Sequence, residues 1–254
     1  QDLLAWRGAL YARLDRTDLA AWSGWLDLPF DLRRGLGEVR LWLQFDRDSV
    51  LDANVDVALS AIDLRLAPDL PRLELQSVSG SLGWRSLRPG HELRTRQLAF
   101  VALDGTVFPP TDVLARQIPA TGKKPETGEI SVNGLDLNAL ATLAIHLPFS
   151  AAQRELLAQS QPRGTLSDFS LKWEGDWSAP RIYAAKGRFA GLGVKPFALK
   201  EGGSKLPGFS GLSGNFDAGE KGGALALNAH GVSAAFSEVF AEPLAFDTLT
   251  AQAS

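Results

Sequence analysis

The sequence predicts a mostly β protein of repeated antiparallel strands with about three short helices. Three observations predict it: apolar and polar residues alternate with a period of two in many segments, 25 glycines and 14 prolines supply turns, and helical signals are only local. The 254 residues are 45% hydrophobic, which is enough apolar mass for a substantial core and argues against disorder.

The clearest strand covers residues 38–46, where every odd position is apolar and most even positions are polar. Residues 55–61 repeat the pattern, and the parity then switches at Ile62, as a bulge or bend requires. Apolar residues that alternate in this way are expected on one wall of the sheet. They are Val39, Leu41, Leu43, Phe45, Val55, Val57, Leu59, Phe169, Leu171, Trp173, Leu225 and Leu227.

Capping signals mark the three short helices. Thr17 or Asp18 can cap the first helix and Asp136 the second. Ser150, with Gln153 three residues later, fits a capping box that opens the third. The helices are expected near residues 18–27, 137–146 and 151–159.

An internal repeat organises the chain. The tripeptide Leu-Pro-Phe at 28–30 recurs at 147–149, and the motifs around both copies keep their order. We expect two modules, residues 1–120 with an incomplete N-terminus and residues 121–254 with a truncated C-terminus. The repeat also favours a strand over a helix at residues 9–14, because the matching segment of the second copy has an extended pattern.

Composition and motifs exclude several classes of function. The 26 basic and 29 acidic residues give a net charge of -3, so nucleic acid is not an expected partner. The absence of cysteine excludes disulfides, zinc ribbons and thiol catalysis. The three histidines lie far apart, and no nucleophile elbow or phosphate-binding loop occurs. We therefore expect no enzymatic activity, no metal and no cofactor.

Two groups of charged residues have alternative interpretations. Four aspartates around one turn raise the possibility of a calcium site, but their spacing lacks the glycine and glutamate of an EF-hand loop, so a solvated loop is favoured. These aspartates are Asp46, Asp48, Asp52 and Asp56. The arginines at 33–34 and at 94 and 96 are candidate contacts for lipid phosphates, although a charged outer strand face is more common.

An apolar sheet face must be covered by a second sheet, by helices or by a molecule from outside. The pattern alone favours a closed β-sandwich, a structural or adhesive module that binds protein or glycan through tryptophans. The alternative is a long, strongly curved sheet that forms an open hydrophobic groove, in which each buried acyl methylene contributes about 0.8 kcal/mol. The tryptophans considered for the sandwich are Trp6, Trp42, Trp84 and Trp177.

Several strings of residues carry a family resemblance that spans nearly the full chain. They are LPFDLRRGLGEVRLW at 28–42, DLRLAPDLP at 63–71, PRG at 162–164, WEG at 173–175 and LPGFSGLSG at 206–214. Together they resemble the YhdP family of AsmA-like proteins. These strings are structural and include no reactive group, so they point to no catalytic site.

The resemblance reverses the preference for a sandwich and favours the open groove built from repeated β-groove modules. It implies a long periplasmic protein of a Gram-negative bacterium, non-catalytic, that conducts phospholipids between the inner and outer membrane. The implied partners are phospholipid acyl chains and, through parts of the protein outside this chain, the two membranes. The chain begins at Gln1 without methionine, and no apolar run approaches the roughly 18 residues that cross a bilayer, so we expect an internal fragment whose inner-membrane anchor lies elsewhere.

Overall fold

The computed structural model describes residues 7–22, 30–47, 49–176, 180–198, 203–236, 240 and 242–254. Its strands are β1 (Arg7–Asp18), β2 (Asp31–Asp46), β3 (Ser49–Arg65), β4 (Leu73–Ser86), β5 (His91–Ala102), β6 (Val107–Ile118), β7 (Thr127–Asp136), β8 (Arg163–Glu174), β9 (Ile182–Val194), β10 (Phe197–Ala198), β11 (Lys205–Leu206), β12 (Gly208–Gly219), β13 (Gly222–Ala235) and β14 (Leu244–Ala253). The helical elements are η2 (Leu19–Trp22), α1 (Leu137–Leu143), η3 (Ala144–His146) and α2 (Ala151–Ser160).

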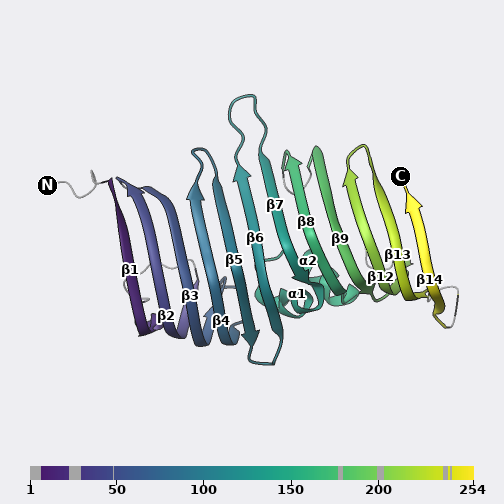
Figure 1. The fold of residues 1–254 in the computed structure, drawn as a ribbon, viewed down its shortest axis with the longest axis horizontal. Coiled ribbons are helices and arrows are strands. Elements are labelled where there is room, and N and C mark those ends of the chain that lie inside the picture. The colour runs from purple at the N-terminus through teal and green to yellow at the C-terminus, as the bar shows by residue number, and fades with distance from the viewer. Residues whose placement is uncertain are drawn as a thin grey trace. The chain divides into compact units, whose positions relative to one another are not determined.

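Twelve of these strands form one open antiparallel sheet, and they follow one another in chain order from β1 to β9 and then through β12, β13 and β14 (Figure 1). The remaining two strands, β10 and β11, form a separate short ribbon. The prediction of a mostly β protein is therefore confirmed. The closed sandwich is not supported, because the described strands include no second large sheet.

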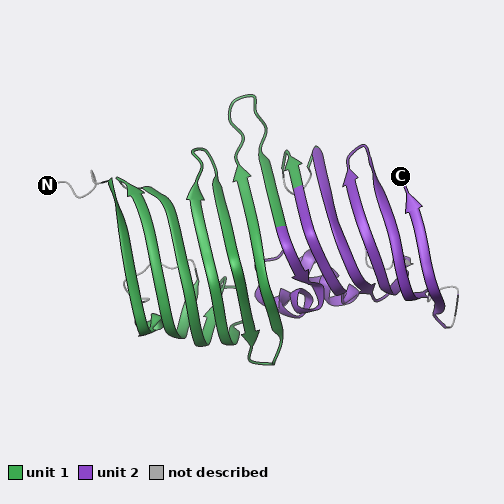
Figure 2. Ribbon diagram, viewed as in Figure 1, with its two compact units in different colours: residues 1–131, 172–181 green, residues 132–171, 182–254 purple. Residues whose placement is uncertain are grey.

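The chain divides into two compact units, which are described separately (Figure 2). Unit 1 comprises residues 1–131 and 172–181 and contains β1 to β6. Unit 2 comprises residues 132–171 and 182–254 and contains α1, α2 and the strands from β9 onward. Strands β7 and β8 contribute to both units. The division into two sequence modules at residue 120 stays a prediction.

Apolar residues pair in register where β2 meets β3. Val39 lies opposite Val57, and Leu41 lies opposite Val55. The register shifts near the start of β2, where Ala61 on β3 has a φ of 50°, and the next residue, Ile62, is buried. This irregularity confirms the bulge that the parity switch predicts.

Two of the three predicted helices are confirmed, because local caps specify them. The Asp136 carboxylate accepts a hydrogen bond from the Ala139 N–H at 2.9 Å, at the start of α1. At α2, the Ser150 hydroxyl accepts from the Gln153 N–H at 3.2 Å, and the Gln153 side chain accepts from the Ser150 N–H at 2.9 Å. This is the reciprocal capping box that the sequence predicts.

The first predicted helix, near residues 18–27, is wrong in its described part. Asp18 still pairs with Leu36 as the last residue of β1, so the strand continues where the helix was expected to begin. Only one 3-10 turn, η2, follows, and the Asp18 carboxylate accepts a hydrogen bond from the Ala20 N–H at 3.0 Å. Residues 23–27 lie outside the described residues.

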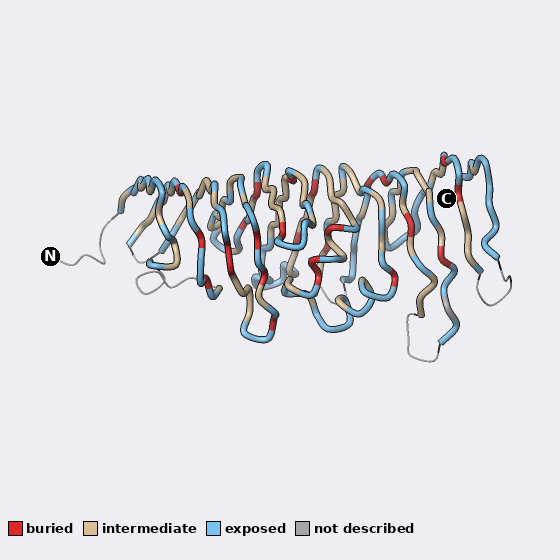
Figure 3. Tube along the Cα trace, turned by 90° about the horizontal axis from the view of Figure 1, so that it is seen from below, coloured by how far each residue is buried: buried red, intermediate tan, exposed pale blue. Residues whose placement is uncertain are grey.

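Each unit buries few side chains, and most buried positions of the strands stand alone among half-buried and exposed ones, with Ile62 and Asp63 as an adjacent pair (Figure 3). The core of unit 1 lies where β2 and β4 begin and β3 and β5 end. Its members are Leu32, Ile62, Leu70, Leu73, Leu75 and Ala102. The core residues of unit 2 include Ala139, Leu143 and Ala144 of the helices and Phe189, Ala229 and Val232 of the sheet.

An ion-pair network fixes the connection between β3 and β4 against the start of β2. Arg72 pairs with Asp31 at 2.7 Å and with Asp63, which is buried, and Arg65 pairs with Asp31 at 3.2 Å. The hydrogen bond from Arg72 holds the pKa of Asp31 below its ordinary value. The network therefore links β2, β3 and the β3–β4 connection at the end of unit 1 that carries the core.

The lowered pKa of Asp31 predicts an acid dependence of stability. Because the folded pKa lies below the unfolded one, Asp31 stabilises the fold above its unfolded pKa of about 3.9, and this contribution is lost as the pH falls through the folded pKa. Asp31→Asn should therefore lower stability at neutral pH and flatten the decline from about pH 5 to about pH 2, as urea unfolding would measure. An equally steep decline in the variant would contradict the assignment.

Gly37 predicts a second effect on stability. Its φ is 150°, and a Cβ at this position would overlap the carbonyl oxygen of Ala58 on the neighbouring strand. Gly37→Ala should reduce the free energy of unfolding by about 2 kcal/mol or more. Gly134→Ala is the matched control, because a Cβ there meets no described atom within 4 Å. Equal losses in the two variants would show that the close approach at Gly37 is unimportant.

Candidate functional site

The apolar side chains of unit 1 are collected on one face of the sheet. Residues directly opposite each other on antiparallel strands point to the same side, so the registers identify the members of a face. Leu43 lies opposite Leu10 on β1 and Ala53 on β3, and Ala53 lies opposite Trp84 on β4. We call this set the apolar face of unit 1: Leu10, Ala12, Val39, Leu41, Leu43, Phe45, Ala53, Val55, Val57, Leu59, Val78, Leu82, Trp84, Leu93, Phe100 and Phe108.

Protein covers this face only partly. Val39 is 9% exposed, but Leu10 is 49% and Leu93 43% exposed, and most other members are half-buried. Large apolar side chains that are exposed singly are ordinary, whereas a continuous set of them on one face marks a surface for binding. The seven predicted groove residues between 39 and 59 all belong to this face.

Unit 2 has a comparable set of apolar side chains. The ring of Phe216 lies 6.5 Å from the rings of both Phe169 and Phe189, measured between centroids. Leu225 pairs directly with Phe216, and Leu227 pairs with Gly214, the residue that also lies opposite Phe189. The structure therefore brings together three of the predicted residues, Phe169, Leu225 and Leu227. Leu171 is half-buried on β8, two residues from Phe169.

Trp173 occupies a different environment from the other predicted residues. It belongs to unit 1 and is 8% exposed. Its ring lies against Gly128 of β7, where a Cβ would overlap it. Similar packing occurs at Gly8 under Phe45 and at Gly187 under Phe216, where a Cβ would lie 3.0 Å and 3.2 Å from the ring atoms. Aromatic rings on these sheets thus rest on glycines.

The opposite face of unit 1 is polar and pairs its charges across strands. Arg85 donates to Asp52 at 2.8 Å, and Lys172 lies 3.3 Å from Glu129. Arg94 is 3.1 Å from Glu92, a buried carboxylate that also pairs with Arg116. Trp42 also lies on this face, with its ring centroid 5.3 Å from that of Tyr11. One face is thus suited to water and the other to hydrocarbon.

The four aspartates of the sequence pattern do not share one loop. Asp52 and Asp56 lie within β3, and Asp56 accepts a hydrogen bond from the Ser81 hydroxyl at 2.6 Å. Asp46 pairs with Arg7 at 2.7 Å, and Asp48 lies outside the described residues. Over the part of the chain that the structure describes, no group of three or more histidines and carboxylates is placed to hold a metal.

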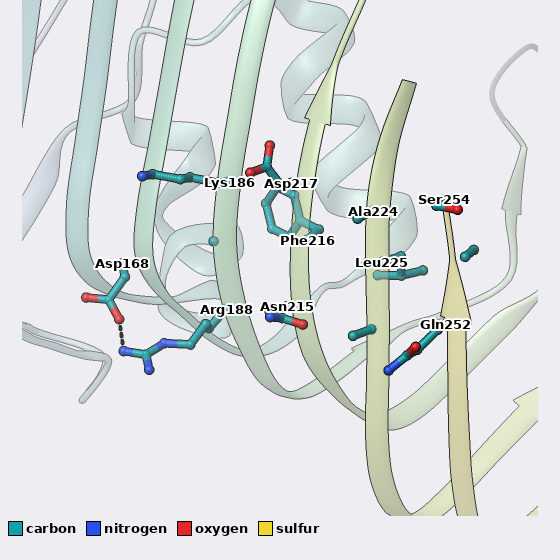
Figure 4. A pocket seen from close by; sticks show the side chains of 13 residues that line it. Asp168, Lys186, Arg188, Asn215, Phe216, Asp217, Ala224, Leu225, Gln252 and Ser254 are labelled. Atoms are coloured by element: carbon teal, nitrogen blue, oxygen red, sulfur yellow. Dashed lines mark hydrogen bonds and ion pairs between the residues drawn. The ribbon is translucent and has the colours of Figure 1, made fainter. Parts of the chain in front are cut away.

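A hollow of 630 Å³ lies on unit 2, lined by polar and apolar residues of β8, β9, β12, β13 and β14 in about equal measure (Figure 4). Arg188 pairs with Asp168, and Lys186 lies opposite Asp217 in the register. Because each cation has an acidic neighbour, the hollow has no marked preference for one sign of ligand charge.

Several aromatic residues of the apolar surfaces of both units are not evident from the alternation of apolar and polar residues. Phe100 stacks on Phe108 with centroids 4.6 Å apart, but the alternation on β5 is interrupted at Gln97, which has a φ of 48°. Phe189 and Phe216 stand opposite glycines, so a pattern of apolar residues alone does not reveal their row. A glycine placed opposite an aromatic residue on the next strand is the signal that could have identified them.

The comparisons with known proteins agree with this architecture. A family model described as YhdP protein matches residues 2–254. Searches of curated proteins and of solved structures each found no match. Among the described residues, no helix is both long enough and apolar enough to cross a membrane. With its match extending over almost every residue, the chain belongs to the YhdP family.

Proposed function

We propose that this chain is a non-catalytic segment of a lipid conduit, in which phospholipid acyl chains lie against the apolar faces. The observation that carries the proposal is the apolar face of unit 1, where side chains from β1 to β6 stand in register and stay partly exposed.

Hydrocarbon is the occupant that fits this surface best. Burial of apolar area contributes about 25 cal/mol per Å², or about 0.8 kcal/mol per methylene. This contribution depends on the area removed from water and not on the orientation of the two groups. An acyl chain can therefore be held firmly and still slide from one row of side chains to the next. No reactive group is needed for such transfer.

Family membership supports the wider setting of the proposal. In this setting, the whole protein is periplasmic, is anchored in the inner membrane by a segment outside this chain, and conducts phospholipids between the inner and outer membranes of a Gram-negative bacterium. The residues that we propose as acyl-chain contacts are Val39, Leu41, Leu43, Phe45, Val55, Val57, Leu59, Phe169, Leu171, Trp173, Leu225 and Leu227.

Native mass spectrometry tests whether lipid occupies the chain. Protein purified without detergent should retain phospholipid, because otherwise the partly exposed apolar face would meet water. A lipid-free protein that takes up no phospholipid from vesicles of phosphatidylethanolamine and phosphatidylglycerol would exclude the conduit.

Charge substitutions test where the lipid lies. Leu43→Asp and Leu59→Asp should each reduce bound phospholipid at least about fivefold, because a carboxylate next to hydrocarbon loses its hydration. Since the face is only partly covered by protein, both variants should stay folded by circular dichroism. The matched controls Gln44→Asp and Ser79→Asp add the same charge at exposed positions of the opposite face and should retain lipid. Unfolding of both leucine variants, with normal controls, would instead indicate a closed core.

A further inference from the structure

The two ends of the strands in unit 1 differ in charge. In an antiparallel sheet, successive connections alternate between the two ends, so the β2–β3, β4–β5 and β6–β7 connections share one end (Figure 1). By sequence these three connections carry four basic and two acidic residues. The β1–β2, β3–β4 and β5–β6 connections at the other end carry one basic and three acidic residues.

Three arginines gather at the first of these ends. Asp46, the last residue of β2, pairs with Arg7 at 2.7 Å and lies 3.8 Å from Arg88 in the β4–β5 connection. Arg47 follows Asp46 directly in the turn, and its charge also acts on Asp46. One carboxylate therefore stands among three guanidinium groups, and the side chain of Arg7 is 77% exposed. We call Arg7, Arg47 and Arg88 the basic rim.

The apolar face is more open toward the basic rim than toward the other end. Leu10 and Leu93, two of its most exposed members, lie within a few residues of the rim. At the other end, Ile62 is 3% and Leu75 5% exposed, and the β3–β4 connection adds Leu70 to the same core. Apolar side chains are therefore buried at this other end, called the closed end below, although Leu103 in the β5–β6 connection and Val107 at the start of β6 are exposed there.

Charge at the closed end is also less available. Arg65 and Arg72 pair there with Asp31 and Asp63, and Arg34 lies 3.9 Å from Glu74. A phosphate at that end would have to compete with carboxylates already in place. At the basic rim, a single described carboxylate faces three cations.

We propose that the basic rim binds the phosphate of a phospholipid whose acyl chains lie on the apolar face of unit 1. This inference rests on the proposed function and adds the end of the strands at which the headgroup travels. Guanidinium groups form paired, charge-assisted hydrogen bonds with phosphate oxygens, which makes arginine well suited to this contact. Phe45, one residue before Asp46, marks the limit of the apolar face at this end of β2. Asp46 and its register partner Arg7 lie on the polar side, so a bound phospholipid would pass over the strand ends, with its tails on one face and its phosphate at the rim.

A pair of short-chain probes tests the inference with the whole chain. Dihexanoylphosphatidylglycerol and dihexanoylglycerol carry the same tails and differ by the phosphate-bearing headgroup, and both would be titrated below their aggregation limits at about 150 mM salt. The rim variant is Arg47→Glu with Arg88→Glu. The control, Arg16→Glu with Arg40→Glu, makes the same change of net charge at exposed positions of β1 and β2 away from the rim. Arg16 and Arg47 have similar φ values of 53° and 58°, so any backbone effect is matched.

We expect the wild type and the control to bind the phospholipid about tenfold more tightly than the diacylglycerol, as one charge-assisted contact provides. The rim variant should keep its affinity for diacylglycerol and lose most of this preference. An unchanged preference in the rim variant, or its loss in the control, would overturn the inference.

Two further outcomes separate the sources of the effect. If inorganic phosphate displaced the phospholipid at equal concentration, the rim would be a simple anion site and the lipid assignment would be wrong. If the wild type bound neither short-chain probe, the proposed function itself would fail, whereas binding of both probes without dependence on the rim would reject only the headgroup assignment.

Discussion

The two-residue period of the β-strand is the constraint on which the rest of the molecule depends. It sends successive side chains to opposite sides, so each strand that alternates apolar and polar residues contributes to both faces at once. In-register pairing then aligns these contributions, as at Val39 with Val57 and Leu41 with Val55. A single local rule thereby produces an apolar surface on one side and a network of paired charges on the other. The membership of the chain in the YhdP family and the proposed transport of lipid both agree with this division.

What could be predicted from the sequence was local. The strand at 38–46, the caps at Asp136 and Ser150 and the bulge before Ile62 each depend on residues a few positions apart, and the structure confirms all of them. The first helix failed for the same reason, because the pairing of Asp18 with β2 depends on a distant partner. Whether such a segment forms a strand or a helix depends on its pairing with a strand that is distant in the sequence. The pattern of one segment does not reveal that pairing.

The ion pairs and the aromatic rows required the same long-range information. Arg72 contacts Asp31 and Asp63 only because the β3–β4 connection returns to the start of β2. The charge difference between the strand ends likewise emerges only when alternate connections are grouped by the antiparallel topology. Each connection alone resembles an ordinary polar turn.

The glycines beneath aromatic rings have a consequence for motion along the sheet. At Gly8, Gly128 and Gly187, the missing Cβ lets a neighbouring ring settle toward the backbone, so the ring fills what would otherwise be a gap in the surface. An apolar surface filled in this way has no gap as large as a methylene group beside these rings. If acyl chains lie on this surface as proposed, a surface without deep gaps would favour their rapid diffusion along it, because few positions would bind a chain much more tightly than the next.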